Sequence, residues 1–276
     1  MANYYGLKLT ILFLIIITYE YWSSLPNFTN TSTAPTHHIK DVFILAGQSN
    51  MAGRGGVIDG DWDGIIPPEI KASPGRILRL GGDLRWVDAQ EPLHADIDVN
   101  KTCGVGPGMA FANAVLRGDP RRFRVVGLVP CAIGGSGIGE WSRGGRLYEG
   151  LTRRAAAAVG GGGEIRAVLW FQGERDTLNI SDAELYKERL HKLFIDLRTD
   201  LKSPLLPVIQ VALASGEGPY IEMVRKAQHG INLPNVMTVD AKGLLLQPDG
   251  LHLSTSAQVQ VGKMLAHAML KSSCAR

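Results

Sequence analysis

The sequence has few cysteines, no long run of one charge and no repeating segment, and each shortage excludes a class of protein. Three cysteines occur among 276 residues, Cys103, Cys131 and Cys274. At most one disulfide could therefore form within the chain, which excludes a disulfide-bonded scaffold. The net charge is +3 and basic residues come only in short pairs, so no nucleic-acid partner is expected. The 33 glycines follow no Gly-X-Y period, and no segment recurs at the fixed spacing of a solenoid or propeller.

The first 39 residues differ in composition from the rest and are expected to direct the chain into the secretory pathway. Leu9 to Thr18 is an almost purely apolar run that follows Lys8 and has the length of a signal-peptide core. Extended through Trp22, the run could instead remain as a membrane anchor over residues 9–22. The polar residues 23–38 resemble a flexible linker. An extracellular, N-glycosylated product is expected, because four N-x-[ST] acceptors occur, at Asn27, Asn30, Asn100 and Asn179.

From residue 40 onward, short apolar runs alternate with segments of helical period. Five runs rich in β-branched residues are typical of strands buried on both faces of a parallel sheet. These are Val42–Ala46, Val125–Pro130, Ala167–Phe171, Val208–Ala212 and Val236–Asp240. Helices are expected between and after them, at Met109–Leu116, Tyr148–Val159, Asp182–Arg198 and Ser254–Leu270. The alternation predicts one α/β domain over residues 40–276, a three-layer α/β/α sandwich with a central, mostly parallel sheet of flavodoxin-like type.

Residues 53–105 fit no strand–helix unit and are expected to form an ordered loop insertion. Asp59, Asp61 and Asp63 match the start of a calcium loop, but Ile70 stands where the bidentate Glu should be, so a polar turn is favoured and no metal is expected. His94, Asp96 and Asp98 are interpreted as part of a solvated loop. Trp62 and Trp86 could stack on sugar rings, and core packing explains them equally well.

Two polar clusters follow predicted strands, where active sites of open α/β sheets lie. Ser49 comes just after the first strand, so its hydroxyl could project above the sheet, although a helix-capping role would also explain it. Gly135 belongs to a Gly-rich loop after the second strand, which is either an ordinary turn or a backbone that approaches a ligand closely.

Two further clusters complete the candidate site. Gln172 follows the third strand and could donate its amide N–H to an oxyanion, while the neighbouring Glu174 and Arg175 are interpreted as a surface ion pair. Asp249 stands three residues before His252, so its carboxylate could fold back on a turn and orient the imidazole as a general base. A lone His near a helix start is usually a surface residue, but the order Ser…Asp…His favours nucleophilic catalysis.

Four blocks together, GQSNMAGRGG, PCAIGGSGIGEW, LWFQGERD and DGLHLS, resemble the SGNH hydrolase superfamily. More narrowly, they resemble plant carbohydrate esterases with a sialic-acid-specific acetylesterase domain, related to carbohydrate esterase family 6. The resemblance covers about residues 40–270. It implies a serine esterase that removes acetyl groups from carbohydrate. It also implies Ser49 as nucleophile, Asp249 and His252 as the rest of the triad, and Gly135 and Gln172 as oxyanion-hole donors. The Ser49 N–H is expected as a further donor, because it would lie at a helix N-terminus. The hydrophobic leader and the glycan acceptors separately predict a location outside the cell or in the cell wall.

The expected chemistry is acyl transfer in two steps, without a cofactor, on an acetylated carbohydrate. Two other functions use the same residues or the same surface. A carbohydrate O-acetyltransferase would pass the acetyl group to a sugar hydroxyl instead of water. A non-catalytic glycan-binding module would bind without turnover, and the complete set Ser49, Asp249 and His252 argues against it. The insertion at 53–105 is expected to set the substrate.

Overall fold

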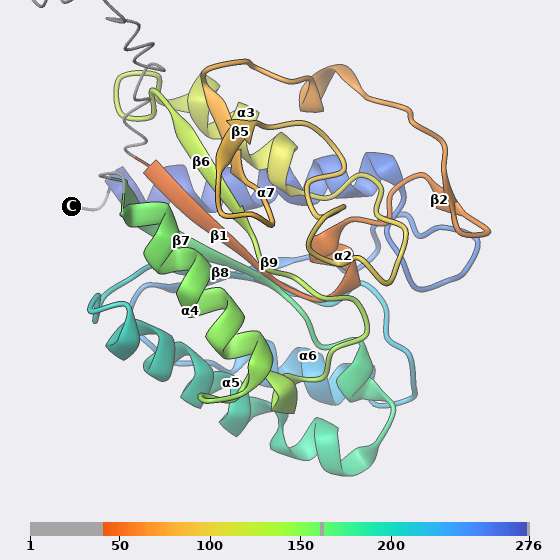
Figure 1. Ribbon diagram of the computed structural model, residues 1–276. Helices are drawn as coiled ribbons and strands as arrows, with labels where there is room; N and C mark the ends of the chain where they lie inside the picture. Colours follow the sequence, from red (N-terminus) through yellow and green to blue (C-terminus); the bar gives the residue numbers. More distant parts are fainter. Residues whose placement is uncertain (1–40, 161–162, 275–276) are drawn as a thin grey trace, which may run out of the picture. The chain divides into compact units, whose positions relative to one another are not determined.

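The computed structural model describes residues 41–160 and 163–274 (Figure 1). The expectations for the hydrophobic leader, the linker and the acceptors Asn27 and Asn30 lie outside the described residues. The other two glycan acceptors, Asn100 and Asn179, are exposed. No helix in the described ranges is both long enough and apolar enough to span a bilayer.

A seven-stranded sheet forms the centre, in the order β5-β4-β6-β1-β7-β8-β9. All neighbouring pairs are parallel except β4 and β5. The strands are β1 (Asp41–Gly47), β4 (Ile77–Leu80), β5 (Trp86–Asp88), β6 (Val126–Pro130), β7 (Glu164–Phe171), β8 (Val208–Ala212) and β9 (Val236–Asp240). The central run β6-β1-β7-β8-β9 has the flavodoxin-like order of a doubly wound sheet.

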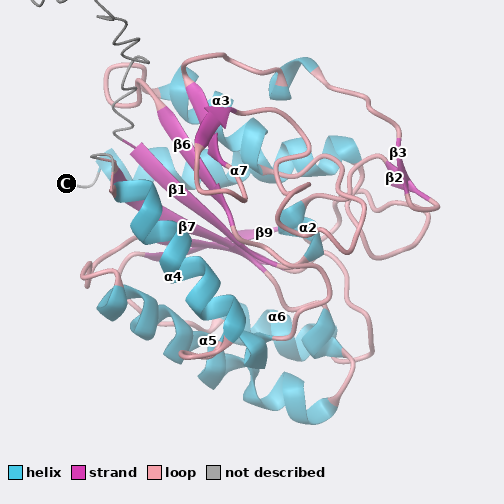
Figure 2. Cartoon of the chain, viewed as in Figure 1, coloured by secondary structure: helices cyan, strands magenta, loops and turns pink. Residues whose placement is uncertain are grey.

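Helices cover both faces of the sheet, which makes three layers (Figure 2). One face carries α3 (Gly108–Gly118) and α7 (Thr255–Cys274), and the other carries α4 (Arg146–Val159), α5 (Ile180–Asp200) and α6 (Ile221–His229). The first crossover, from β1 to β6, uses α3, and the next, from β6 to β7, uses α4. The winding therefore reverses between β1 and β7, and open α/β sheets bind their ligands at the carboxyl ends of the strands at such a point.

The central strands are buried because both of their faces carry apolar side chains. Every residue of β1, β6 and β8 is buried. Phe43 of β1 packs edge-on against Phe111 of α3, with ring centroids 4.8 Å apart. Trp170 of β7 packs against Trp141 on the other face, at 5.3 Å. Aromatic contacts thus anchor helical layers on both sides of the sheet.

The predicted fold class is confirmed, as are the five predicted strands and the four predicted helices, each within a few residues at its ends. The interpretation of residues 53–105 as loops alone is wrong, because β4 and β5 from this insertion extend the main sheet. Helix α6 was not expected. It buries two polar side chains, Arg225 and Gln228, and therefore lacks a clear apolar stripe in the sequence.

Cys103 and Cys131 are buried and form no disulfide. Burial raises the pKa of the Cys131 thiol to about 12, against the opposing effect of Arg154. The thiol is therefore not a thiolate at neutral pH, and the prediction that Cys131 is a buried free thiol is confirmed.

The contact between α3 and α7 predicts opposite effects for two glycines within helices. A Cβ on Gly262 of α7 would lie 2.4 Å from the Pro107 carbonyl oxygen and 2.6 Å from the Ala110 Cβ, whereas a Cβ on Gly150 of α4 would meet nothing within 4 Å. Gly262→Ala should lower the Tm, since overpacking costs about 1–3 kcal/mol. The matched control Gly150→Ala should raise it slightly, by about 0.5–1 kcal/mol of helix preference. Thermal unfolding measures both; a Gly262→Ala variant as stable as the wild type would contradict this packing.

Candidate active site

The candidate site lies at the carboxyl ends of β1 and β7, where the winding of the sheet reverses. Strand β1 leads directly into α2 (Ser49–Ala52), a single turn whose first residue is Ser49. Two close contacts fix the start of this turn: the Gln48 N–H donates to the Phe171 carbonyl of β7 at 2.9 Å, and Gly47 lies so near β7 that a Cβ there would be 2.0 Å from the same oxygen. Gly47 has φ +133°, a conformation that favours glycine. Ser49 is therefore held in one position.

The structure brings together the three residues predicted as a triad. The Nε2 atom of His252 lies 3.0 Å from the Ser49 Oγ. The Nδ1 atom of the same ring lies 2.6 Å from the Asp249 Oδ2. Because an ionised carboxylate only accepts hydrogen bonds, it selects the tautomer with a proton on Nδ1 and leaves Nε2 free to accept the serine proton.

Asp249 and His252 occupy the turn of a small hairpin. Leu246 bridges to Leu253, and the Gln247 N–H donates to the His252 carbonyl at 2.7 Å. Gly250, at φ +67°, lets the chain reverse. This turn is why a spacing of three residues places the carboxylate against the ring.

The Asp249 carboxylate is held in its ionised form. Partial burial would raise its pKa, but hydrogen bonds from the backbone N–H groups of His252 and Leu251, and from the His252 ring, outweigh burial and lower the pKa below its ordinary value. Both backbone bonds go to Oδ1 at 2.9 Å, so Oδ2 stays available for the imidazole. Asp249 is thus oriented by the backbone of its own turn.

Two of the predicted oxyanion donors have open N–H groups. Within the described residues, neither the Ser49 N–H nor the Gly135 N–H has an acceptor. Gly135 adopts φ +75°, and the space where a Cβ would lie is open. The neighbouring Gly134 N–H donates to Asp98 at 3.1 Å, which fixes the loop. The geometry therefore allows both N–H groups to face a ligand beside Ser49.

The third predicted donor, Gln172, lies at the site with its amide already engaged. Its side chain is completely buried, and Nε2 donates to the Ser136 carbonyl at 2.9 Å, the Gln48 Oε1 at 3.2 Å and the Asp176 Oδ2 at 2.5 Å. Burial raises the pKa of Asp176 to about 6, against the bonds from Gln172 and Ile138. Gln172 thus joins the Ser49 turn to the 136–138 loop, and its oxyanion role stays a prediction.

The interpretation of Glu174 and Arg175 as a surface ion pair is wrong. Glu174 is fully buried, and its Oε1 accepts a hydrogen bond from the Asn50 Nδ2 at 2.8 Å. Arg175 is exposed and pairs with Glu217 instead, at 3.6 Å. Burial raises the pKa of Glu174 to about 7, although the bond from Asn50 opposes this. Neither Asn50 nor Glu174 was predicted as a site residue; the only signal was their place directly after buried strands.

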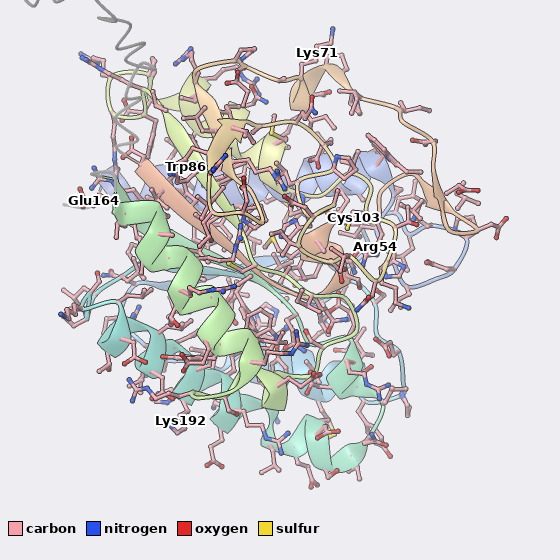
Figure 3. All side chains as sticks on the ribbon, in the orientation of Figure 1. Arg54, Lys71, Trp86, Cys103, Glu164 and Lys192 are labelled. Atoms are coloured by element: carbon pink, nitrogen blue, oxygen red, sulfur yellow. The ribbon has the colours of Figure 1, made fainter. Side chains whose placement is uncertain are left out.

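Burial also tests the interpretation of His94, Asp96 and Asp98 as a solvated loop. His94 and Asp98 are buried, so a solvated loop is wrong for them. Asp98 forms an ion pair with Arg54. The Nη1 atom of Arg54 also donates to the Cys103 Sγ at 3.4 Å, and Figure 3 labels these two residues close together near α2. Burial lowers the pKa of His94 to about 3, so this ring is neutral at physiological pH.

The aspartates of the suggested calcium loop form a hairpin. Strands β2 (Val57–Ile58) and β3 (Asp61–Trp62) pair around Asp59 and Gly60, which have φ 53° and 89°. Two positive φ values in a two-residue loop are typical of a tight hairpin turn. No group of three or more His, Cys, Asp or Glu side chains within the described ranges could hold a metal ion. Trp62 and Trp86 are partly buried and pack against the core.

Residues 39–271 match the family described as carbohydrate esterase, sialic acid-specific acetylesterase. An Arabidopsis thaliana protein named "Probable carbohydrate esterase At4g34215" is 56% identical over 239 residues, which cover 84% of this chain and 91% of that protein. The X-ray structure of the same Arabidopsis protein has a TM-score of 0.82 at 55% identity and covers 84% of this chain and 98% of its own. The crystal structure of NanS, 17% identical, shares the fold with a TM-score of 0.67 over 87% of this chain and 99% of its own.

The buried carboxyl of Glu174 predicts a specific pH dependence of stability. Its folded pKa of about 7 exceeds the ordinary value of 4.5, so the folded protein retains a proton that the unfolded chain loses. The free energy of unfolding contributed by this group therefore falls as pH rises from about 4.5 to 7. Glu174→Gln removes this loss, and its Tm relative to the wild type should increase by several degrees between pH 5 and pH 8. A Tm difference that does not change with pH would show that Glu174 is already ionised in the folded state.

Proposed function

Because this chain belongs to the carbohydrate esterase family of sialic acid-specific acetylesterases, we propose that it hydrolyses O-acetyl esters of carbohydrates with Ser49 as nucleophile. The observation that carries the proposal is the continuous chain of hydrogen bonds from Asp249 through His252 to Ser49, with distances of 2.6 and 3.0 Å. A serine hydroxyl is a poor nucleophile without a base, and this chain supplies one.

In the first step, the Ser49 Oγ attacks the acetyl carbonyl carbon while His252 Nε2 takes the hydroxyl proton. Negative charge develops on the carbonyl oxygen, and the N–H groups of Ser49 and Gly135 would donate to it. One such donor is typically worth about 10²–10³ in kcat. The C–O bond to the sugar then breaks, and the sugar oxygen leaves with the proton from His252.

In the second step, water hydrolyses the acetyl-enzyme. His252 takes a proton from the water as its oxygen attacks the acetyl carbon, and the same N–H groups stabilise the second oxyanion. The bond to the Ser49 Oγ breaks, Ser49 regains its proton from His252, and acetate leaves. Asp249 keeps the imidazole oriented and stabilises its charged form throughout.

The insertion at 53–105 is the part of the chain that we propose sets the substrate. It supplies one wall of a cavity of 710 Å³, through Gly56, Ile58, Asp63, Pro67 and Glu69. The triad residues do not line this cavity, which we propose holds a part of the substrate remote from the ester. The opposite wall comes from Gln247 of the hairpin that carries Asp249 and His252, and from the first turns of α7. The hydroxyl, amide and carboxylate groups that line the cavity suit a sugar.

Acetate release across acetylated xylan, acetylated pectin and small acetylated sugars tests whether the insertion sets the substrate. Equal rates on all of these substrates would count against this assignment.

The triad should behave as one unit when it is mutated. Ser49→Ala and His252→Ala should each lower kcat for acetate release by roughly 10⁴ or more, and the double variant should be little worse than either single variant. Asp249→Asn should be equally or less damaging, because it misdirects the imidazole without removing it. Acetate release is measured in water without an acceptor, with circular dichroism to confirm folding.

Two results would contradict the proposal. A folded Ser49→Ala variant that releases acetate at the wild-type rate would remove Ser49 from the mechanism. Wild-type protein that binds acetylated glycans without any turnover would indicate a binding module, and turnover only with an added sugar acceptor would indicate a transferase.

A further inference from the structure

The side chain of Asn50, next to Ser49 in sequence, is tied to the backbone on both sides of His252. Its Oδ1 accepts the Leu253 N–H at 2.9 Å, and its Nδ2 donates to the Leu251 carbonyl at 3.4 Å. A backbone N–H can only donate, so this contact fixes which end of the amide is the oxygen. Asn50 therefore joins the turn that carries the serine to the hairpin that carries the histidine.

Glu174 fixes the orientation of this amide from the other side. Its Oε1 accepts from the Asn50 Nδ2 at 2.8 Å, and both residues are completely buried. A second donor, Gln258 of α7, reaches the Asn50 Oδ1 at 3.3 Å. Inside a buried, low-dielectric region such a network allows few alternative arrangements, because each unpaired polar group would cost free energy.

We propose that Asn50 and Glu174 form a positioning pair that holds the His252 ring at hydrogen-bond distance from the Ser49 Oγ. This inference rests on the proposed function, since it assigns a role within the same triad. Glu174 has no hydrogen bond to Ser49 or to His252, and Asp249 already occupies the Nδ1 side of the ring. Glu174 therefore acts on the His252 ring through Asn50 and the backbone of Leu251 and Leu253.

The pair predicts that hydrogen-bonding capacity at position 174 matters, and that negative charge does not. Glu174→Gln keeps an oxygen that can accept from Asn50, and kcat should stay within about threefold of the wild type. Glu174→Ala removes the acceptor, lets the amide turn, and should lower kcat by roughly 10–100-fold, because small misplacements of a catalytic group are costly. KM should change much less than kcat, since neither residue contacts the proposed substrate.

A reversed hydrogen bond gives the sharper test. Asn50→Asp retains the oxygen that Leu253 needs. At pH 9, above the Glu174 pKa of about 7, it places two carboxylates against each other, so kcat at that pH should fall by at least about tenfold. In Asn50→Asp/Glu174→Gln, the Gln amide can donate to the Asp, and kcat should recover most of this loss. Rescue by a second substitution shows that the single variant was misaligned and not merely unfolded; the Tm of each variant is measured alongside.

Two outcomes would overturn the inference. If Glu174→Gln lowers kcat as much as Glu174→Ala does, the negative charge itself is needed. If the double variant has no higher kcat than Asn50→Asp, the hydrogen bond between positions 50 and 174 is not needed. Failure of the proposed function is recognised separately, because wild-type protein would then release no acetate. In that case labelling of Ser49 by a fluorophosphonate probe gives the readout, and its rate should follow the same order among the variants.

Discussion

The position of the serine depends on how the short segment after β1 is held against the end of β7. Gly47 allows the two backbones to approach, and the Gln48 N–H bonds to Phe171 at 2.9 Å. The Gln48 Oε1 then accepts the N–H groups of Gly173 and Arg175, at 3.2 and 3.3 Å. The side chains on either side of Ser49 thus bind neighbouring segments. Gln48 binds the loop that follows β7, and Asn50 binds the hairpin that carries His252. The serine itself is left with its Oγ directed at the imidazole.

Three carboxyl groups near the site differ in pKa because their surroundings differ. Asp249 lies in a partly exposed turn, where hydrogen bonds from two backbone N–H groups outweigh partial burial and lower its pKa. Glu174 and Asp176 lie in the interior, where burial raises the pKa to about 7 and about 6. Such a division is typical of sites in which one acid must remain ionised and others serve as structure. It agrees with an orienting role for Asp249.

The sequence predicted the parts of the molecule that local pattern determines. The buried strands are continuous apolar runs, and the Asp249–His252 spacing follows from one tight turn. Burial of polar residues could not be predicted, because it depends on distant segments: Asp98 is buried by Arg54 and the Gly134 loop, and Glu174 by Asn50. The direction of the Gln172 amide likewise depends on Asp176 and Ser136 together. Strands β4 and β5 were missed because three or four residues carry too little periodicity and gain stability only by joining the sheet.

The central claim is that the acetyl group passes through Ser49. It is tested most directly by mixing the protein with an activated aryl acetate, quenching with acid within the first turnover, and mapping the acetylated peptide by mass spectrometry. The account predicts one acetyl group per chain on the peptide that contains Ser49, formed as fast as the initial burst of the aryl alcohol and absent from Ser49→Ala. An aryl alcohol burst without acetylated Ser49, or acetate formed with no covalent intermediate at any time, would contradict it.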